Sequence, residues 1–163
     1  MTWLKLPIRK CQTLLELSEC ERSLLLQALG LLPLVAISVR LKGLQFTQGF
    51  LLRLPLANRY APSTVANAEL ERQVWTTVRM VRVAVGYNSR WTNCLKQSLV
   101  LWILLRSQGI ISVLRIGVRT ETDKFSAHAW VEYQGIVLND TDDVHQRFQA
   151  FDRSFEQPIQ EKL

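Results

Sequence analysis

The chain has 163 residues, 48% of them hydrophobic, which is enough to bury the core of a single domain. Its net charge is +6, and the basic excess lies in residues 1–60, which carry eight Lys or Arg against three Glu. No cluster of basic residues with interleaved aromatic residues is present, which argues against nucleic-acid binding. We interpret the basic third as an ordinary solvated surface, with an anionic peptide or a membrane surface as the alternative partners.

The cysteines are Cys11, Cys20 and Cys94. Their number is odd, and neither a CxxC motif nor a Cys/His spacing typical of metal ligands occurs, so we expect no disulfide framework, no metal site and no cofactor. The N-terminus lacks a charged segment followed promptly by an apolar one, which predicts a cytoplasmic protein.

A first helix is predicted from a capping box formed by Ser18 and Glu21. It should run to about Leu41 and bend near Pro33. Residues 23–41 are strongly apolar, but their uninterrupted part is too short to span a bilayer comfortably. A buried helix is therefore the first interpretation, an interfacial membrane helix the second and a spanning helix the third.

The next segment, residues 42–64, is interrupted by glycines and prolines and predicts a connection with a short helix around Phe50. A second helix follows from about Val65 to Val85. Its predicted core stripe consists of valines at helical spacing: Val74, Val78, Val81 and Val85.

A third helix should begin at Asn93–Cys94 and end at Gly109. Its predicted inward stripe is Leu95, Leu99, Trp102, Ile103 and Arg106. After this helix the period of the apolar residues changes to two in "VLRIGVR" (113–119), which indicates a half-buried strand.

A β-hairpin is predicted in "FSAHAWVEYQGIVLND" (125–140). A two-residue loop would need positive φ at Gln134, which glutamine resists, whereas a three-residue loop needs glycine only at Gly135. We therefore expect the three-residue loop, which pairs His128 directly with Asp140. The two-residue register would instead set Asp140 opposite Ala129.

The residues after this hairpin, from 141 onward, are polar with isolated aromatics. Phe148 and Phe151 are expected to dock against the sheet, and His145 is expected at the surface. Asp142 and Asp143 are interpreted as solvated loop charges.

Three side chains together suggest nucleophilic catalysis. Cys94 lies at a predicted helix start, where free amides and the helix dipole favour a thiolate. His128 next to a carboxylate could act as the base, although such a pair can also serve only to set the strand register. Cys11 and Cys20 are interpreted as small buried hydrophobes. Trp130 shares the face of His128, where it would line a substrate groove or fill the core.

The ordered set "CLKQSLVLWILLRSQGI", "LRIGVR" and "FSAHAWVEYQGIVLND" resembles the transglutaminase-like cysteine peptidase of lasso-peptide biosynthesis, the B protein or its stand-alone protease half. The resemblance is close over residues 90–141. It implies an α+β fold with a papain/transglutaminase-like core, in which a helix packs on a small antiparallel sheet. Residues 1–60 would form a helical N-terminal region and residues 61–163 the peptidase core. By this resemblance Cys94 is the nucleophile, His128 the general base and acid, and Asp140 the orienting carboxylate.

The resemblance also implies a function: removal of the leader from a ribosomally made lasso-peptide precursor. The implied partners are the precursor peptide, a leader-recognition protein and an ATP-dependent cyclase similar to asparagine synthetase. No strand-rich winged-helix unit is apparent, so we expect the recognition protein to be a separate chain. A transglutaminase or acyltransferase with the same triad is the alternative enzyme, and a non-catalytic scaffold that presents a peptide is the alternative outside enzymes.

The oxyanion site departs from the papain pattern, which often places a Gln before the Cys. Only Asn88 and Asn93 stand in the corresponding region. The Cys94 amide with one further donor, not identified from the sequence, would have to hold the oxyanion.

Overall fold

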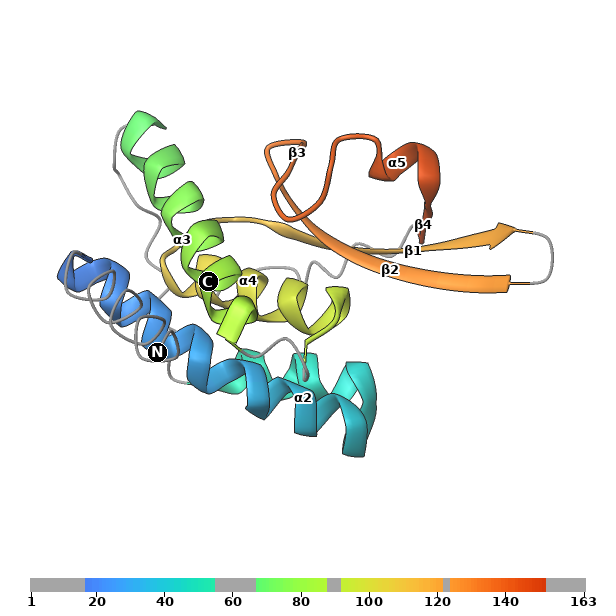
Figure 1. Cartoon of the computed structure of the whole chain (residues 1–163), viewed down its shortest axis with the longest axis horizontal. Coiled ribbons are helices and arrows are strands. Elements are labelled where there is room, and N and C mark those ends of the chain that lie inside the picture. The colour runs from blue at the N-terminus through green and yellow to red at the C-terminus, as the bar shows by residue number, and fades with distance from the viewer. Residues whose placement is uncertain (1–16, 55–66, 88–91, 122–123, 152–163) are drawn as a thin grey trace, which may run out of the picture.

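The computed structural model describes residues 17–54, 67–87, 92–121 and 124–151, except for the side chains of residues 120–125. The fold is α+β, as predicted: helices pack beside a small, curled antiparallel sheet (Figure 1). The elements in chain order are α2 (Glu19–Arg53), α3 (Asn67–Tyr87), α4 (Cys94–Ser107), β1 (Val113–Glu121), β2 (Lys124–Tyr133), β3 (Ile136–Val137), α5 (Val144–Arg147) and β4 (Gln149–Ala150). The predicted domain boundary near residue 60 lies outside the described residues.

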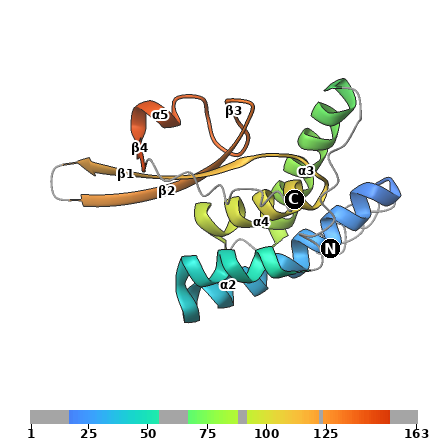
Figure 2. The same ribbon diagram turned by 180° about the vertical axis from the view of Figure 1, so that it is seen from behind.

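Helix α2 begins at the predicted capping box. The amide of Glu21 donates to the Ser18 hydroxyl at 3.3 Å, and the amide of Ser18 donates to the Glu21 carboxylate at 2.8 Å. The helix breaks at Gly43, where φ is 81°, while Pro33 lies within the helix without interrupting its dihedral angles. Beyond Gly43 a shorter helical segment folds back beside the first (Figure 2). It contains Phe50, so the short helix predicted there is confirmed.

The two halves of α2 are joined by a hydrogen bond of 2.8 Å between the hydroxyls of Ser38 and Thr47. By length and composition α2 could cross a membrane, but one third of its most apolar window is buried inside the protein. One face packs on α3 and α4, so the helix is partly buried, and the choice between a buried and an interfacial helix stays a prediction. The opposite face of the segment before Gly43 leaves Leu26, Leu34, Ile37 and Leu41 exposed, and Phe46 is exposed in the segment after it.

Helices α3 and α4 confirm the predicted helices. Of the valine stripe, Val74, Val78 and Val81 are buried. Helix α4 starts at Cys94 after Asn93, whose side chain accepts from the Lys96 amide at 3.1 Å. The predicted inward stripe of α4 was too narrow, since every residue from 98 to 105 is buried. The reason is tertiary: α4 is enclosed by α2, α3 and the sheet.

The sheet has the strand order β3-β2-β1-β4, with antiparallel neighbours. Alternate residues of β2 serve two clusters. Val131 and Tyr133 join the core shared with the helices, whereas Trp130 packs in a second cluster with Val137, Val144 and Phe148. Phe148 docks as predicted, but the prediction for Phe151 was wrong because its side chain is 52% exposed.

The β2–β3 turn differs from the prediction. Tyr133 pairs with Ile136, so the loop has two residues, Gln134 and Gly135, with φ of 49° and 81°. The expected three-residue loop is therefore wrong. Two positive φ values match the right-handed twist of the flanking strands, and this match outweighs the cost of a left-handed conformation at glutamine.

Neighbouring atoms pack closely around Gly117, and this packing predicts the effect of a substitution on stability. A Cβ there would lie 2.9 Å from the Trp130 ring and 3.0 Å from both the Gln149 oxygen and the Phe148 Cβ. We expect Gly117→Ala to lower the free energy of unfolding by about 1–3 kcal/mol through overpacking. The matched control is Gly30→Ala, which has open space and should be neutral or stabilising. Urea denaturation measures both, and an unchanged stability of Gly117→Ala would contradict the prediction.

Candidate active site

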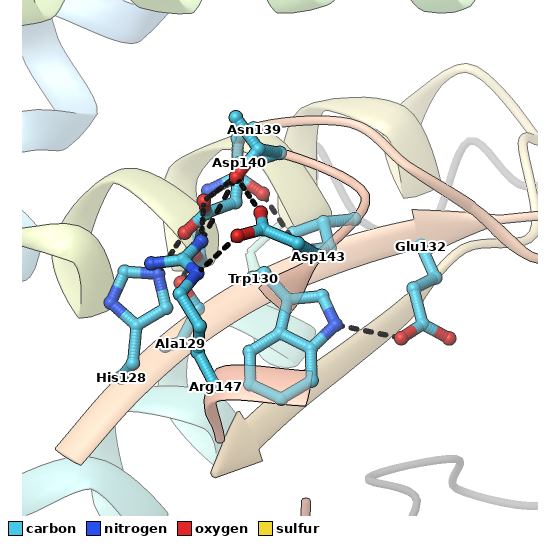
Figure 3. A network of polar contacts seen from close by, with 11 residues as sticks. His128, Ala129, Trp130, Glu132, Asn139, Asp140, Asp143 and Arg147 are labelled. Carbon is cyan, nitrogen blue, oxygen red and sulfur yellow. Dashed lines mark hydrogen bonds and ion pairs between the residues drawn. The ribbon is translucent and has the colours of Figure 1, made fainter. Parts of the chain in front are cut away.

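His128 and Asp140 are in contact, although the register that predicted this was wrong. His128 Nε2 and Asp140 Oδ2 form a hydrogen bond (Figure 3). Strand β3 ends at Val137, and residues 138–140 form a bend. Asp140 is therefore released from the position opposite Ala129 that a continued two-residue register would impose. The predicted pair is confirmed, and its cause is the bend after β3.

The bend is held by polar contacts that the sequence analysis did not identify. The Leu138 amide donates to the Val131 carbonyl at 2.9 Å, and the Asn139 Oδ1 accepts from the Val131 amide at 2.8 Å. Asn139 Nδ2 also donates to the Ser98 hydroxyl at 2.9 Å. The side chain of Asn139 thus replaces a main-chain partner of Val131 in the sheet, and it anchors the bend to α4 through Ser98.

Ser98 connects this bend to the helix that carries Cys94. Its hydroxyl donates to the Ala129 carbonyl at 2.9 Å. Because Cys94 precedes Ser98 by four residues, it lies about one turn away on the same face of α4. Helix α4 and strand β2 run in the same general direction in Figures 1 and 2. The start of α4 therefore lies toward the part of β2 that holds His128.

The carboxylate of Asp140 is held on both oxygens. Oδ1 accepts from the Thr141 amide and from Arg147 Nη2, each at 2.7 Å, while Oδ2 meets His128. Partial burial by itself raises the pKa of Asp140, but the hydrogen bonds from Thr141, Arg147 and His128 outweigh it and the pKa lies below its ordinary value. Asp140 is therefore ionised beside the imidazole.

Arg147 is a site residue that the sequence analysis missed. It also pairs with Asp143, with 3.1 Å between Nε and Oδ2, so Asp143 belongs to this network and is more than a solvated loop charge (Figure 3). Arg147 is the last residue of helix α5, which has only four residues and is too short for a periodic pattern to mark it in the sequence.

The imidazole of His128 stacks against two aromatic rings, Phe148 and Trp130. The centroid of the His128 ring lies 4.8 Å from that of Phe148 and 6.2 Å from that of Trp130. Trp130 is fully buried, and its indole N–H donates to Glu132 at 2.7 Å. This burial favours the interpretation of Trp130 as core. His145 is half exposed, as predicted, and stands edge-on to Trp130.

Cys94 is the first residue of α4, and its side chain is partly exposed. No hydrogen bond joins its Sγ to His128 within the described parts of the chain, and the Nδ1 of His128 likewise has no hydrogen-bond partner there. This nitrogen is available to a thiol, because Nε2 is engaged by Asp140. Asn88 lies outside the described residues, and the side-chain oxygen Oδ1 of Asn93 is used as the helix cap.

The arrangement provides an imidazole oriented by an ionised carboxylate and a cysteine at a helix N-terminus, the components of nucleophilic catalysis. Within residues 17–54, 67–87, 92–121 and 124–151, no group of three or more His, Cys, Asp or Glu side chains could hold a metal ion.

Comparison with known families adds one finding. The family model described as "Transglutaminase-like superfamily" matches residues 31–152, about three quarters of the chain. This range includes Cys94, His128 and Asp140. No curated protein and no solved structure matches the chain significantly.

Proposed function

The chain belongs to the transglutaminase-like superfamily, and we propose that it is a cysteine peptidase that removes the leader from a ribosomally made lasso-peptide precursor. The superfamily and its fold are consistent with a cysteine peptidase or acyltransferase. The restriction to lasso-peptide leaders rests on the sequence resemblance over residues 90–141.

The observation that carries the proposal is the contact of His128 with the ionised Asp140. His128 lies in the part of β2 toward which the start of α4 lies. A carboxylate on Nε2 locks the imidazole tautomer, so that Nδ1 is left unprotonated and can act as a base. A pair that served only to hold the strand register would not need the remaining nitrogen to be free. A scaffold that merely presents a peptide would need neither this pair nor a cysteine at the helix start.

The proposed reaction proceeds through an acyl-enzyme. His128 takes the proton of the Cys94 thiol, and the sulfur attacks the carbonyl carbon at the end of the leader. The developing oxyanion is stabilised by amides at the start of α4. His128 then gives its proton to the leaving amine of the core peptide, and the C–N bond breaks. A water molecule, deprotonated by His128, attacks the thioester carbonyl. The C–S bond breaks, the proton returns from His128 to the Cys94 sulfur, and the leader leaves with a free carboxylate. Asp140 stabilises the imidazolium in both halves of the reaction.

An acyltransferase is the second candidate, since the same residues would form the same acyl-enzyme and an amine would replace water. Product analysis decides between them: incubation with a primary amine such as methylamine gives a leader with a free carboxylate in the first case and a leader amide in the second. Exclusive formation of the amide would contradict the peptidase proposal.

The proposed partners are a separate leader-recognition protein and an ATP-dependent cyclase similar to asparagine synthetase, all in the cytoplasm. We predict that this chain alone processes its precursor slowly, and that the recognition protein raises the rate about 100-fold by raising the local concentration of the leader. Mass spectrometry of the released leader measures the rate. A precursor with a scrambled leader is the control and should gain nothing. Equal rates with and without the recognition protein would contradict the two-protein scheme.

A further inference from the structure

Helix α2 has an apolar face that points away from the protein. In the segment before Gly43, the residues that pack into the core recur at helical spacing, among them Leu25, Ala28, Leu32 and Val35. The opposite side carries exposed apolar side chains, with exposed fractions of 69% for Leu26, 40% for Leu34, 53% for Ile37 and 71% for Leu41. At 3.6 residues per turn these four side chains lie within an arc of about 80°. They are called the outer face below.

No charge interrupts the outer face between its ends. None of residues 23–39 is charged, and the other exposed residues between Leu26 and Leu34 are Gly30 and Pro33. A helix that is apolar all round is normally enclosed by a protein core or by a membrane. One side of α2 lies in the core, but in the described part of the chain no helix or strand covers the outer face (Figures 1 and 2). An exposed apolar face of this kind marks a contact site.

Basic side chains stand at both ends of the outer face. Arg22 lies at one end, and Arg40 and Lys42 lie at the other, and all three residues are exposed. By the helical period Arg22 and Arg40 fall on the border of the outer face itself. Long basic side chains can extend to charged groups while the apolar side chains beside them are buried. The ends of the face therefore suit negative charge next to an apolar phase.

Acidic side chains scarcely offset this positive charge. Helix α2 contains two acidic residues, Glu19 and Glu21. Glu21 is partly buried and forms an ion pair with Arg79 of α3, so that only Glu19 is exposed. The rim of the outer face is therefore net positive.

The surface of an anionic bilayer fits this arrangement better than a protein does. Arg22 and Arg40 are separated by 18 positions, which at 1.5 Å per residue is about 27 Å along the helix. Lipid headgroups are mobile and meet cations at any such separation. A protein partner would need an apolar strip of the same length, with acidic residues placed at both of its ends.

We propose that the outer face of α2 binds the surface of a membrane that contains anionic lipids, with the helix lying in the plane of the interface. The apolar side chains enter the boundary of the acyl region, and the basic residues at both ends meet the headgroups. The helix lies on the bilayer and does not span it, because a span would separate its buried residues from α3 and α4. The inference uses no residue of the candidate active site, so it is independent of the proposed peptidase activity and adds a place of action to it.

Flotation of the unaltered protein with lipid vesicles tests the class of lipid. The two vesicle preparations are pure phosphatidylcholine and phosphatidylcholine with about one quarter of anionic phosphatidylglycerol. Each basic residue near an anionic surface strengthens binding about fivefold, so the three basic residues together should give a preference of about 100-fold for the anionic vesicles. Salt at about 1 M, which shortens the Debye length to about 3 Å, should remove this preference. Equal binding to both preparations, or binding to neither, would overturn the proposal.

Ile37→Glu places a charge within the outer face. Because Ile37 is already half exposed, the fold should persist, which circular dichroism checks. We expect binding to the anionic vesicles to weaken at least about 10-fold, since an apolar side chain leaves the bilayer and a carboxylate faces the headgroups. The matched control is Ile136→Glu, which adds the same charge at an isoleucine of similar exposure in β3, on the side of α4 away from α2 (Figure 1). The control should bind within about twofold of the unaltered protein, and equal weakening by the two variants would contradict a site on α2.

The basic residues are tested by the double variant Arg40→Gln with Lys42→Gln. Binding to the anionic vesicles should weaken about 25-fold, and binding to neutral vesicles should not change. An equal loss on both vesicle preparations would contradict the role of charge.

Two other results would assign the outer face differently and overturn the proposal. A dimer that Ile37→Glu dissociates, with vesicle binding unchanged, would assign the face to a second copy of the chain. Protein that stays with the vesicles through an alkaline carbonate wash would show that α2 spans the bilayer.

Discussion

Cys94→Ala is expected to abolish leader removal while the protein stays folded. In the proposed mechanism no other group can form the acyl-enzyme, so the rate should fall to that of the reaction without enzyme. The fold should persist because Cys94 is partly exposed at the first position of α4, where alanine is a favourable helix residue. The Asn93 cap, which holds the Lys96 amide, is untouched by the change. Mass spectrometry of the precursor measures cleavage, and thermal unfolding measures stability.

The control for this variant is Cys20→Ala. The interpretation of Cys20 as a small buried hydrophobe was wrong, because it is exposed in the first turn of α2. It lies far along the chain from the His128–Asp140 pair, and its replacement should leave the rate unchanged. Full activity of Cys94→Ala would end the proposal that this protein is a thiol enzyme. A loss in both variants together with lowered stability would mean that the cysteines serve the fold.

Asp140→Asn is expected to lower kcat/KM by about 100- to 10,000-fold, because the imidazole loses the partner that fixes its tautomer and stabilises its protonated form. The asparagine is nearly the same size and can still accept from Thr141 and Arg147, so the bend after β3 should survive. Steady-state kinetics with the precursor measure the loss, and circular dichroism checks the fold. A loss smaller than about tenfold would show that His128 needs no carboxylate.

Arg147→Gln is the matched control for this network. It leaves the Asp140 carboxylate on His128 but removes one of the donors that lower its pKa. The pKa of Asp140 should therefore rise, and because the carboxylate must be ionised to act, activity should be lost at a higher pH on the acid side. At neutral pH the loss should be much smaller than in Asp140→Asn, since the carboxylate is still ionised there.

The sequence by itself determined the features that depend on near neighbours along the chain. The capping box of Ser18 and Glu21, the start of α4 at Asn93–Cys94 and the inward valines of α3 all appear as predicted. Each of these follows from hydrogen bonds within one helical turn or from the 3.6-residue period, which a single segment displays without reference to the rest of the fold.

Tertiary structure decided what a segment's own pattern could not show. Helix α4 is buried on every side because α2, α3 and the sheet enclose it, whereas its sequence suggested one inward stripe. The break of α2 lies at Gly43, where the chain turns back on itself, and Pro33 is accommodated within the helix.

The candidate site itself combines both levels. The residues His128 and Asp140 were recognisable from the sequence, but the explanation by register failed, since the turn takes two residues and sets Tyr133 opposite Ile136. The pair forms because Asn139 leaves the ladder to bind Val131 and Ser98, and Arg147 then receives the displaced carboxylate. Such contacts join residues 7 to 41 positions apart, and their geometry exists only once α4, the bend and α5 have packed together.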